Sequence, residues 1–161
     1  MRVLFASSEV YPLAKTGGLA DVSAALPRAL ADLGVDVQLI LPGYPQALEA
    51  AANKTVKAEI TCAGTSDTTR LIRACMPDSG HPVWLVDGPL LFNRPGTLYQ
   101  DQFGADWPDN AQRFAHFNAV AARLALGELV PNWQADVVHA NDWHTGLLPI
   151  LLGHTRKERP R

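Results

Sequence analysis

The pattern of hydrophobic and polar positions predicts that the chain begins with a strand, a helix and a second strand. Segments 2–7 and 35–41 are almost uninterrupted apolar runs, which is typical of strands covered on both faces. Between them, apolar residues recur at helical spacing, at Leu19, Val22, Leu26, Leu30 and Leu33. Pro27 predicts a kink in this helix or a short first segment, and Gly34 predicts its end. Such a βαβ unit is normally right-handed and parallel.

The middle of the chain is richer in β-forming residues. Residues 48–54 predict a short helix or a loop. Three β-rich segments follow, at 56–62, 69–76 and 82–87. Turn-forming residues at 64–67 and 78–80 separate them. We expect antiparallel hairpins inserted at the edge of a sheet, and we assign the apolar segment 83–86 to the central sheet.

The second half predicts a long loop followed by a helix, a strand and a helix. The loop at 88–108 is rich in Pro, Gly, Asp and aromatic residues, and a loop of this length is uncommon unless it is functional. A packed surface excursion is the alternative. We expect a helix at 109–128, a buried strand at 135–140 and a further helix from 145. The whole pattern predicts an α/β fold, a Rossmann-like parallel sheet with helices on both faces and an inserted β-hairpin region.

Composition narrows the class of protein. The chain has 161 residues, of which 47% are apolar, and a formal net charge of −2. These values predict one globular domain over 1–161. They show no excess of basic residues of the kind that binds nucleic acid. Cys62 and Cys75 lack metal-binding spacing, so we expect two reduced thiols in a cytoplasmic protein. We expect no signal peptide and no membrane-spanning segment.

A glycine pair between the first strand and the first helix predicts an anion site. Gly17 and Gly18 let the backbone approach a ligand closely and adopt a φ above zero, and the first amides of the next helix face the ligand. Lys15 adds a positive charge before the pair, and Asp21 follows it. We interpret this stretch as a phosphate site, with an ordinary turn as the alternative. It matches neither the dinucleotide-binding nor the P-loop signature.

A second polar turn, with Asp142 and His144, follows the predicted strand at 135–140. The carboxyl ends of parallel strands lie at one edge of a sheet, so we expect both turns to share a crevice. The crevice should contain Lys15, Gly17, Gly18, Asp21, Asp142 and His144. The alternatives are that His144 packs or caps a helix and that Asp142 is a helix cap.

A third polar set begins the helix at 109–128. Asp109 and Arg113 are spaced to lie on one face of that helix, with Asn110 beside them. An ordinary surface ion pair is the alternative to a ligand-binding role.

Several of these segments resemble the signature motifs of one enzyme family. They are Lys15-Thr16-Gly17-Gly18-Leu19-Ala20-Asp21-Val22, Ser8-Glu9-Val10-Tyr11-Pro12, Leu41-Pro42-Gly43-Tyr44-Pro45 and His139-Ala140-Asn141-Asp142-Trp143-His144-Thr145-Gly146-Leu147. Over nearly its whole length the chain resembles the N-terminal part of bacterial glycogen synthases and plant starch synthases. The resemblance implies a GT-B glycosyltransferase, in which two Rossmann-like domains face each other across a cleft. This chain would be the N-terminal, acceptor-side domain, and nothing in it matches the C-terminal nucleotide-sugar domain.

The resemblance also implies an activity and its partners. The family transfers glucose from ADP-glucose to the non-reducing end of an α-1,4-glucan, with retention at the anomeric carbon and without a metal or other cofactor. The implied partners are ADP-glucose, the α-glucan acceptor and the missing C-terminal domain. Without that domain we expect no transfer. Neither nucleic acid nor a membrane is an expected partner.

The resemblance implies two catalytic residues, His144 and Asp21. His144 would bind the donor glucose through its backbone carbonyl or its ring, and Asp21 would lie near the reacting sugar and the acceptor. The implied substrate-binding residues are Lys15, Gly17, Gly18, Asp109, Asn110, Arg113 and Asp142. The first three would contact the distal phosphate of the nucleotide sugar and stabilise the ADP leaving group.

Three other functions remain open from the residues. The first is a non-catalytic glucan- or nucleotide-binding module. The second is a dinucleotide-dependent dehydrogenase domain, which the missing glycine fingerprint disfavours. The third is another GT-B enzyme, such as a relative of sucrose synthase or phosphorylase. The choice between ADP-glucose and UDP-glucose lies outside this chain.

Overall fold

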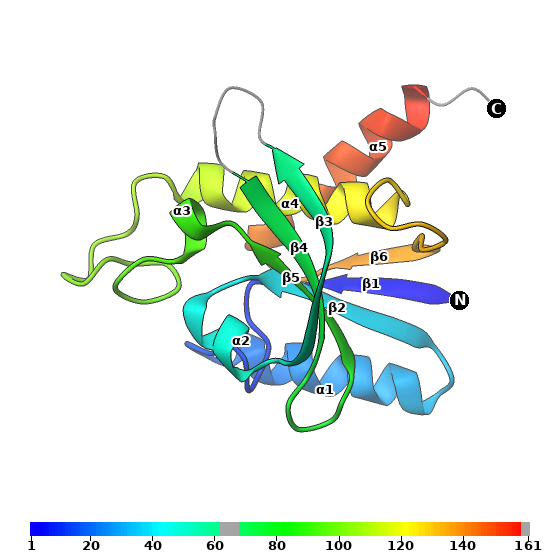
Figure 1. The fold of residues 1–161 in the computed structure, drawn as a ribbon, viewed down its shortest axis with the longest axis horizontal. Helices are drawn as coiled ribbons and strands as arrows, with labels where there is room; N and C mark the ends of the chain where they lie inside the picture. Colours follow the sequence, from blue (N-terminus) through cyan, green and yellow to red (C-terminus); the bar gives the residue numbers. More distant parts are fainter. Residues whose placement is uncertain (62–67, 159–161) are drawn as a thin grey trace.

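Within residues 1–61 and 68–158, which this computed structural model describes, six strands form one mixed sheet in the order β3-β4-β5-β2-β1-β6 (Figure 1). The strands are β1 Arg2–Ala6, β2 Asp36–Pro42, β3 Ala52–Thr61, β4 Thr68–Cys75, β5 Pro82–Asp87 and β6 Val137–Ala140. β5, β2, β1 and β6 are parallel, whereas β4 is antiparallel to both β3 and β5. The predicted α/β fold with an inserted hairpin is therefore confirmed.

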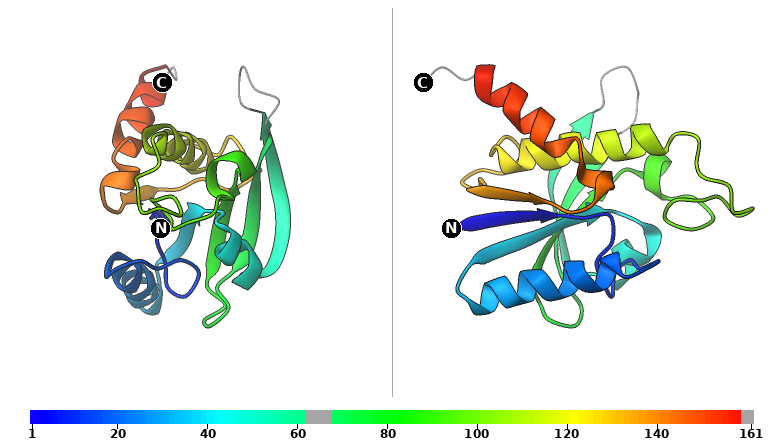
Figure 2. Two further views of the ribbon diagram at one scale, coloured as in Figure 1. Left: turned by 90° about the vertical axis from the view of Figure 1, so that its left-hand side faces the viewer. Right: turned by 180° about the vertical axis from the view of Figure 1, so that it is seen from behind.

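Helices cover both faces of this sheet, as predicted. α1 Leu19–Asp32 lies on one side of the central strands, and α4 Asn110–Ala125 lies with α5 Leu148–Glu158 on the other (Figure 1, Figure 2). The short helices are α2 Pro45–Ala50, α3 Pro89–Phe92 and the 3-10 helix η1 Trp143–Thr145. β1 pairs with β2 on one side and with β6 on the other, so the strand order reverses at β1. Ligands of open α/β sheets bind at such a point.

The ends of α1 agree with the sequence pattern, but Pro27 does not divide the helix. α1 runs through Pro27, which is buried, so a short first segment is wrong. Gly34 has φ 82°, and the amides of Gly34 and Val35 donate back to carbonyls of the last turn at 2.9 and 3.1 Å. Only glycine adopts this backbone conformation at little cost, and the predicted helix end is confirmed.

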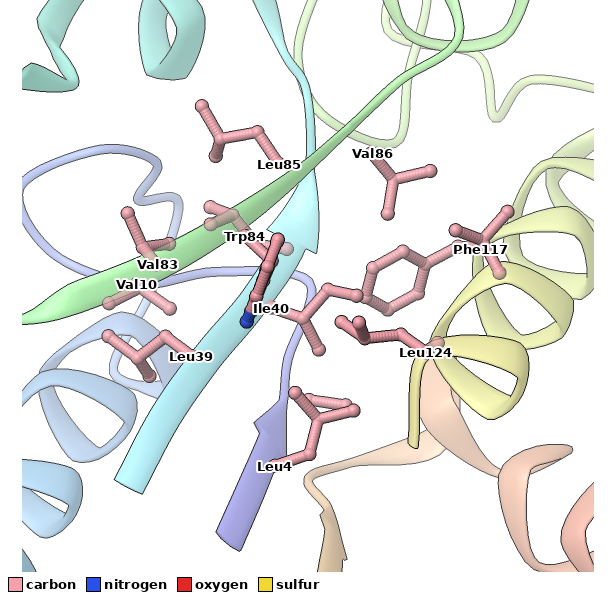
Figure 3. Packing of buried hydrophobic residues seen from close by; sticks show 14 of the residues in the cluster. Leu4, Val10, Leu39, Ile40, Val83, Trp84, Leu85, Val86, Phe117 and Leu124 are labelled. Carbon is pink, nitrogen blue, oxygen red and sulfur yellow. The ribbon is translucent and has the colours of Figure 1, made fainter. Parts of the chain in front are cut away.

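Packing of α4 on the central strands fixes the loop that precedes it. Figure 3 shows Phe117 and Leu124 of α4 facing the strands that carry Ile40 and Leu4, and all four side chains are fully buried. Burial of each such side chain contributes about 1.5–3 kcal/mol. Arg113 of α4 donates to the carbonyls of Leu91 and Leu98, so α4 in turn holds the segment 88–108, which was predicted as a loop and contains the short helix α3 Pro89–Phe92.

Three predicted helix boundaries are wrong, and two strands also begin elsewhere, β3 at Ala52 rather than 56 and β6 at Val137 rather than 135. The short helix begins at Pro45, and Lys54, which was placed in it, lies in β3. Proline at the first helical position accounts for this start, because its missing amide is not needed there. α4 ends at Ala125, since Gly127, with φ 77°, ends the helical run. The last helix begins at Leu148, because η1 occupies the first positions after β6.

β6 is not the buried strand that its apolar residues predict. Val137 is 45% exposed, and the other three residues are partly or well exposed. β6 lies at the edge of the sheet and pairs with β1 alone, so one of its sides has no neighbouring strand within the described residues.

Two predictions fall outside the described residues. They concern the turn at 64–67 and the thiol of Cys62. Cys75 carries a free thiol. In the part of the chain that is described, no helix combines the length and the apolar character that a bilayer crossing needs.

Candidate active site

The carboxyl ends of β1 and β6 meet at one pocket of about 550 Å³. The loop after β1 contributes Glu9, Thr16, Gly17, Gly18 and Leu19, and the turn after β6 contributes Asp142, Trp143 and His144. The long loop and the start of α4 complete it with Thr97, Tyr99, Gln100, Asp106 and Asn110. The two polar turns therefore share one rim, as their positions after parallel strands predict.

A second cavity, of about 640 Å³, lies beside β6 and between α4 and α5. Its lining is mainly aliphatic and includes Ala125, Leu126, Leu148 and Leu152. None of the predicted site residues lines it. The pocket at the strand ends is the candidate active site, although it is the smaller of the two, because polar groups from several elements converge there.

The glycine pair leaves open space beside the pocket. A Cβ added at Gly17 or Gly18 would meet nothing within 4 Å, and neither glycine has the positive φ that the sequence suggested. Gly18 is the N-cap of α1, and no side chain caps this helix. The first amides of α1 are thus offered to the pocket with the positive end of the helix dipole behind them.

Lys15 and Asp21 pair with each other rather than with the pocket. The Lys15 ammonium donates to both carboxylate oxygens of Asp21, at 2.6 and 2.7 Å. The two side chains are 43% and 56% exposed, and neither residue lines the pocket. An exposed pair of this kind contributes only about 0–1 kcal/mol, so a ligand can separate it at little cost.

Glu9 occupies part of the predicted anion site. Its carboxylate accepts hydrogen bonds from the amide of Thr16 at 2.7 Å, the hydroxyl of Thr16 at 2.6 Å and the amide of Gly17 at 3.3 Å. The hydroxyl of Tyr99 donates to it at 2.6 Å. Burial alone would raise the pKa of Glu9, but the hydrogen bonds from Thr16, Tyr99 and Gly17 outweigh burial and lower it. Glu9 is therefore a buried carboxylate ion at neutral pH.

His144 presents a buried imidazole to the pocket. The residue is 4% exposed, and neither ring nitrogen has a hydrogen-bond partner among the described residues. Its ring stacks on those of Trp143 and Tyr99, with centroids 3.9 and 4.6 Å away, and meets Phe114 edge-on. Burial lowers the pKa of His144, so the ring is neutral at pH 7 and can donate one hydrogen bond and accept another.

The backbone around His144 is fixed by Asp142 and Asn118. Asp142 has φ 69° and ψ 172°, a region that is almost confined to glycine, and its carboxylate accepts from the amide of Trp143 at 2.6 Å. Asp142 thus caps η1, as one alternative predicted, and also lines the pocket. The carboxamide of Asn118 donates to the carbonyl of His144 at 2.7 Å. Together these contacts hold the turn that carries the imidazole.

The third polar set divides into a pocket residue and two supporting residues. Asn110 lines the pocket, donates to the carbonyl of Tyr99 at 2.9 Å and accepts from Arg113 at 2.6 Å. Arg113 is only 1% exposed, and its guanidinium also donates to the carbonyls of Leu91 and Leu98. It therefore fastens the long loop to α4 instead of lining the pocket.

Asp109 has a different partner from the one its spacing predicts. Its carboxylate takes two hydrogen bonds from Arg94, both at 2.7 Å, and the pair with Arg113 is not formed. The reason is that Arg113 points into the protein, where backbone carbonyls satisfy it. Asp109 does not line the pocket.

Comparison with known proteins identifies the family. The family model described as the starch synthase catalytic domain matches residues 2–161. The chain belongs to the starch synthase catalytic domain family. It is 55% identical over 153 residues to the glycogen synthase of Paramagnetospirillum magneticum. This match covers 94% of this chain and 31% of that protein. It is 50% identical over 158 residues to the glycogen synthase of Burkholderia thailandensis, covering 98% of this chain and 30% of that protein. The chain thus spans about a third of the length of these curated relatives.

A solved structure agrees with this assignment. The catalytic domain of starch synthase IV from Arabidopsis thaliana, bound to ADP and acarbose, superposes with a TM-score of 0.71 at 28% identity. The match covers 91% of this chain and 29% of that one. The resemblance drawn from the motifs and the GT-B fold class are therefore confirmed. The roles of individual residues and the cytoplasmic location stay predictions.

Several residues that line or support the pocket were not predicted as site residues, and Glu9, Tyr99 and Asn118 are the three with the most contacts to it. Glu9 is an acidic residue next to an apolar strand, and Asn118 is a polar residue on the apolar stripe of α4, so each breaks a hydrophobic pattern. Tyr99 carries no such signal within its aromatic-rich loop. Among the described residues, no group of three or more His, Cys, Asp or Glu side chains could hold a metal ion.

Proposed function

We propose that this chain forms the acceptor-side half of a retaining glucosyltransferase, which moves glucose from ADP-glucose to the non-reducing end of an α-1,4-glucan. The observation that supports the proposal is the pocket that joins the uncapped start of α1 to the buried imidazole of His144, in a chain of this family. The remaining two thirds of such an enzyme would supply most of the contacts to ADP-glucose.

The start of α1 would receive the diphosphate. Gly18 and Leu19 line the pocket at the positive end of the helix dipole, and this is where backbone amides favour an anion. Lys15 would exchange Asp21 for a phosphate oxygen, since their pair is exposed and weak. Positive charge at this place stabilises the ADP leaving group as the glycosidic bond to phosphate breaks.

His144 would bind the glucose that is transferred. A neutral imidazole whose two nitrogens have no hydrogen-bond partner among the described residues matches sugar hydroxyls, which both donate and accept hydrogen bonds. Asp21, released from Lys15, would lie near the reacting sugar, and Asn110 and Asp142 complete the polar lining. Asp109 and Arg113 would act indirectly, by holding the long loop in place.

The test is a transfer assay with a chimaera. This chain replaces the matching third of the Paramagnetospirillum magneticum glycogen synthase, and incorporation of labelled glucose from ADP-glucose into glycogen is measured. We expect turnover by the chimaera and none by residues 1–161 alone.

Two outcomes would contradict the proposal. An inactive but folded chimaera, with a chain that binds maltooligosaccharides in calorimetry, would show a non-catalytic binding module instead. Turnover by residues 1–161 alone would show that the pocket is a complete active site rather than half of one.

A further inference from the structure

Glu9 is a buried anion without a cationic partner. It is 2% exposed, and no ammonium or guanidinium among the described residues lies within ion-pair distance of it. Lys15, the closest basic residue along the chain, pairs with Asp21. Within the described part of the chain, the hydrogen bonds to the carboxylate of Glu9 come from the neutral donors of Thr16, Gly17 and Tyr99. Burying an ion in this way is costly unless hydrogen bonds compensate for it, so the contacts to Glu9 hold the groups that donate them in place.

The carboxylate connects the two halves of the pocket. One oxygen accepts from the two backbone amides at the glycine pair, and the other accepts from the hydroxyls of Thr16 and Tyr99. The hydroxyl of Tyr99 also bonds the hydroxyl of Ser8 at 2.9 Å, and its ring lies nearly parallel to that of His144, at 21°. The glycine loop and the imidazole are thus joined through Glu9 and Tyr99.

We propose that Glu9 is a positioning residue that holds the glycine loop and, through Tyr99, the imidazole of His144 in one arrangement for glucosyl transfer. The proposal rests on the function proposed above. It also assigns a different ligand group to each end of the pocket. The amides of Thr16 and Gly17 are already occupied by a carboxylate, and a phosphate beside them would be repelled by that charge. Phosphate is therefore left to the amides from Gly18 onward, and sugar hydroxyls, which donate hydrogen bonds, suit the end near Glu9.

The kinetic test uses the active chimaera with Glu9→Gln, Tyr99→Phe and the double variant. Glu9→Gln keeps the shape and removes the charge, and Tyr99→Phe removes only the hydroxyl that links the loop to His144. The controls are Glu49→Gln, at an exposed position of α2, and Tyr44→Phe, which removes a buried hydroxyl outside the pocket.

We expect each pocket variant to lower kcat about 10- to 100-fold, because a shift of about 1 Å at the reacting groups has effects of this size. KM for the glucan should change less than three-fold, and both controls should keep the parent kcat. Both substitutions break the same link, so the double variant should lose much less than the product of the single losses. Independent, multiplicative losses, or values of kcat within two-fold of the parent, would overturn the proposal.

Hydrogen exchange tests the loop without relying on turnover. In Glu9→Ala, the amides of Thr16 and Gly17 lose their acceptor, and exchange in peptides covering 14–20 should become about ten-fold faster. Glu49→Gln should leave this exchange unchanged. Unchanged exchange in Glu9→Ala would overturn the positioning role. An inactive parent chimaera with the expected exchange would contradict the proposed function and leave the contact of Glu9 with the loop supported.

Discussion

Buried polar residues in this molecule differ greatly in how well they are satisfied. Glu9 receives four hydrogen bonds, and the guanidinium of Arg113 makes three. The hydroxyl of Tyr44, by contrast, is buried with no partner among the described residues, and burial raises its pKa. An unpaired buried hydroxyl lowers the free energy of unfolding by about 1–3 kcal/mol, whereas the buried ring that carries it contributes to stability.

Tyr44→Phe should therefore stabilise the fold. Removing the unpaired hydroxyl keeps the edge-on contact with Phe92, and we expect the free energy of unfolding to rise by about 1 kcal/mol. Urea denaturation of both proteins measures the difference. Tyr11→Phe, at a position that is 52% exposed, serves as the matched change and should have little effect. A less stable Tyr44→Phe would show that the hydroxyl has a partner.

Asp142 stores backbone strain at the rim of the pocket. Its φ of 69° and ψ of 172° belong to a region that costs a non-glycine residue about 1–3 kcal/mol. Asp142→Gly and Asp142→Ala both remove the cap of η1, but only glycine relieves the strain. We expect the glycine variant to be more stable than the alanine variant by about 1 kcal/mol or more in urea denaturation. Equal stabilities would show that the strain is absent in solution.

Glycines play opposite parts in two helices. Gly34 ends α1 in a left-handed conformation that alanine adopts only at a cost, whereas Gly153 lies inside α5 with open space around its Cβ position. A glycine in a helix interior is less favourable than alanine by about 0.5–1 kcal/mol.

Matched alanine substitutions at these two glycines should shift stability in opposite directions. Gly34→Ala should lower the melting temperature, because the strain of about 1–2 kcal/mol acts on the folded state. Gly153→Ala should raise it slightly. Thermal denaturation followed by circular dichroism measures both. A rise for Gly34→Ala would contradict the helix end assigned here.

At the scale of the whole molecule, burial changes the pKa of three histidines in the same direction. Burial lowers the pKa of His81, of His116 in α4 and of His144 in η1 below the ordinary value of 6.5. Folding therefore favours their neutral forms. Above pH 6.5 both the folded and the unfolded chain hold these rings neutral, and no penalty arises. As the pH falls through 6.5, the unfolded chain gains protons that the folded chain does not, so stability is lost.

The free energy of unfolding should consequently decrease between pH 7.0 and pH 5.5, by at most about 1.4 kcal/mol per pH unit for each proton. Urea denaturation at the two values measures the loss. His144→Gln removes the most deeply buried of the three rings, so the loss should be smaller in that variant. An equal loss would show that His144 takes up a proton in the folded chain. Glu9 does not obscure this window, because its pKa lies below 4.5.

The sequence alone determined the family, the α/β fold and the meeting of the two polar turns. Each depends on local patterns: apolar runs, helical spacing, Gly34 at a helix end, and turns that follow parallel strands. Parallel strands bring their carboxyl ends to one edge whatever the details of packing, so the pocket followed from the order of elements.

The partner that each polar side chain takes depends instead on how the chain folds in three dimensions. Lys15 binds Asp21, Arg94 replaces Arg113 beside Asp109, and Glu9 takes the amide of Gly17. β6 is exposed although its residues are apolar, since strand exposure depends on neighbours in the sheet. Such contacts join residues that lie far apart in sequence or compete for the same donor. They depend on distances and burial in three dimensions, which local spacing does not encode.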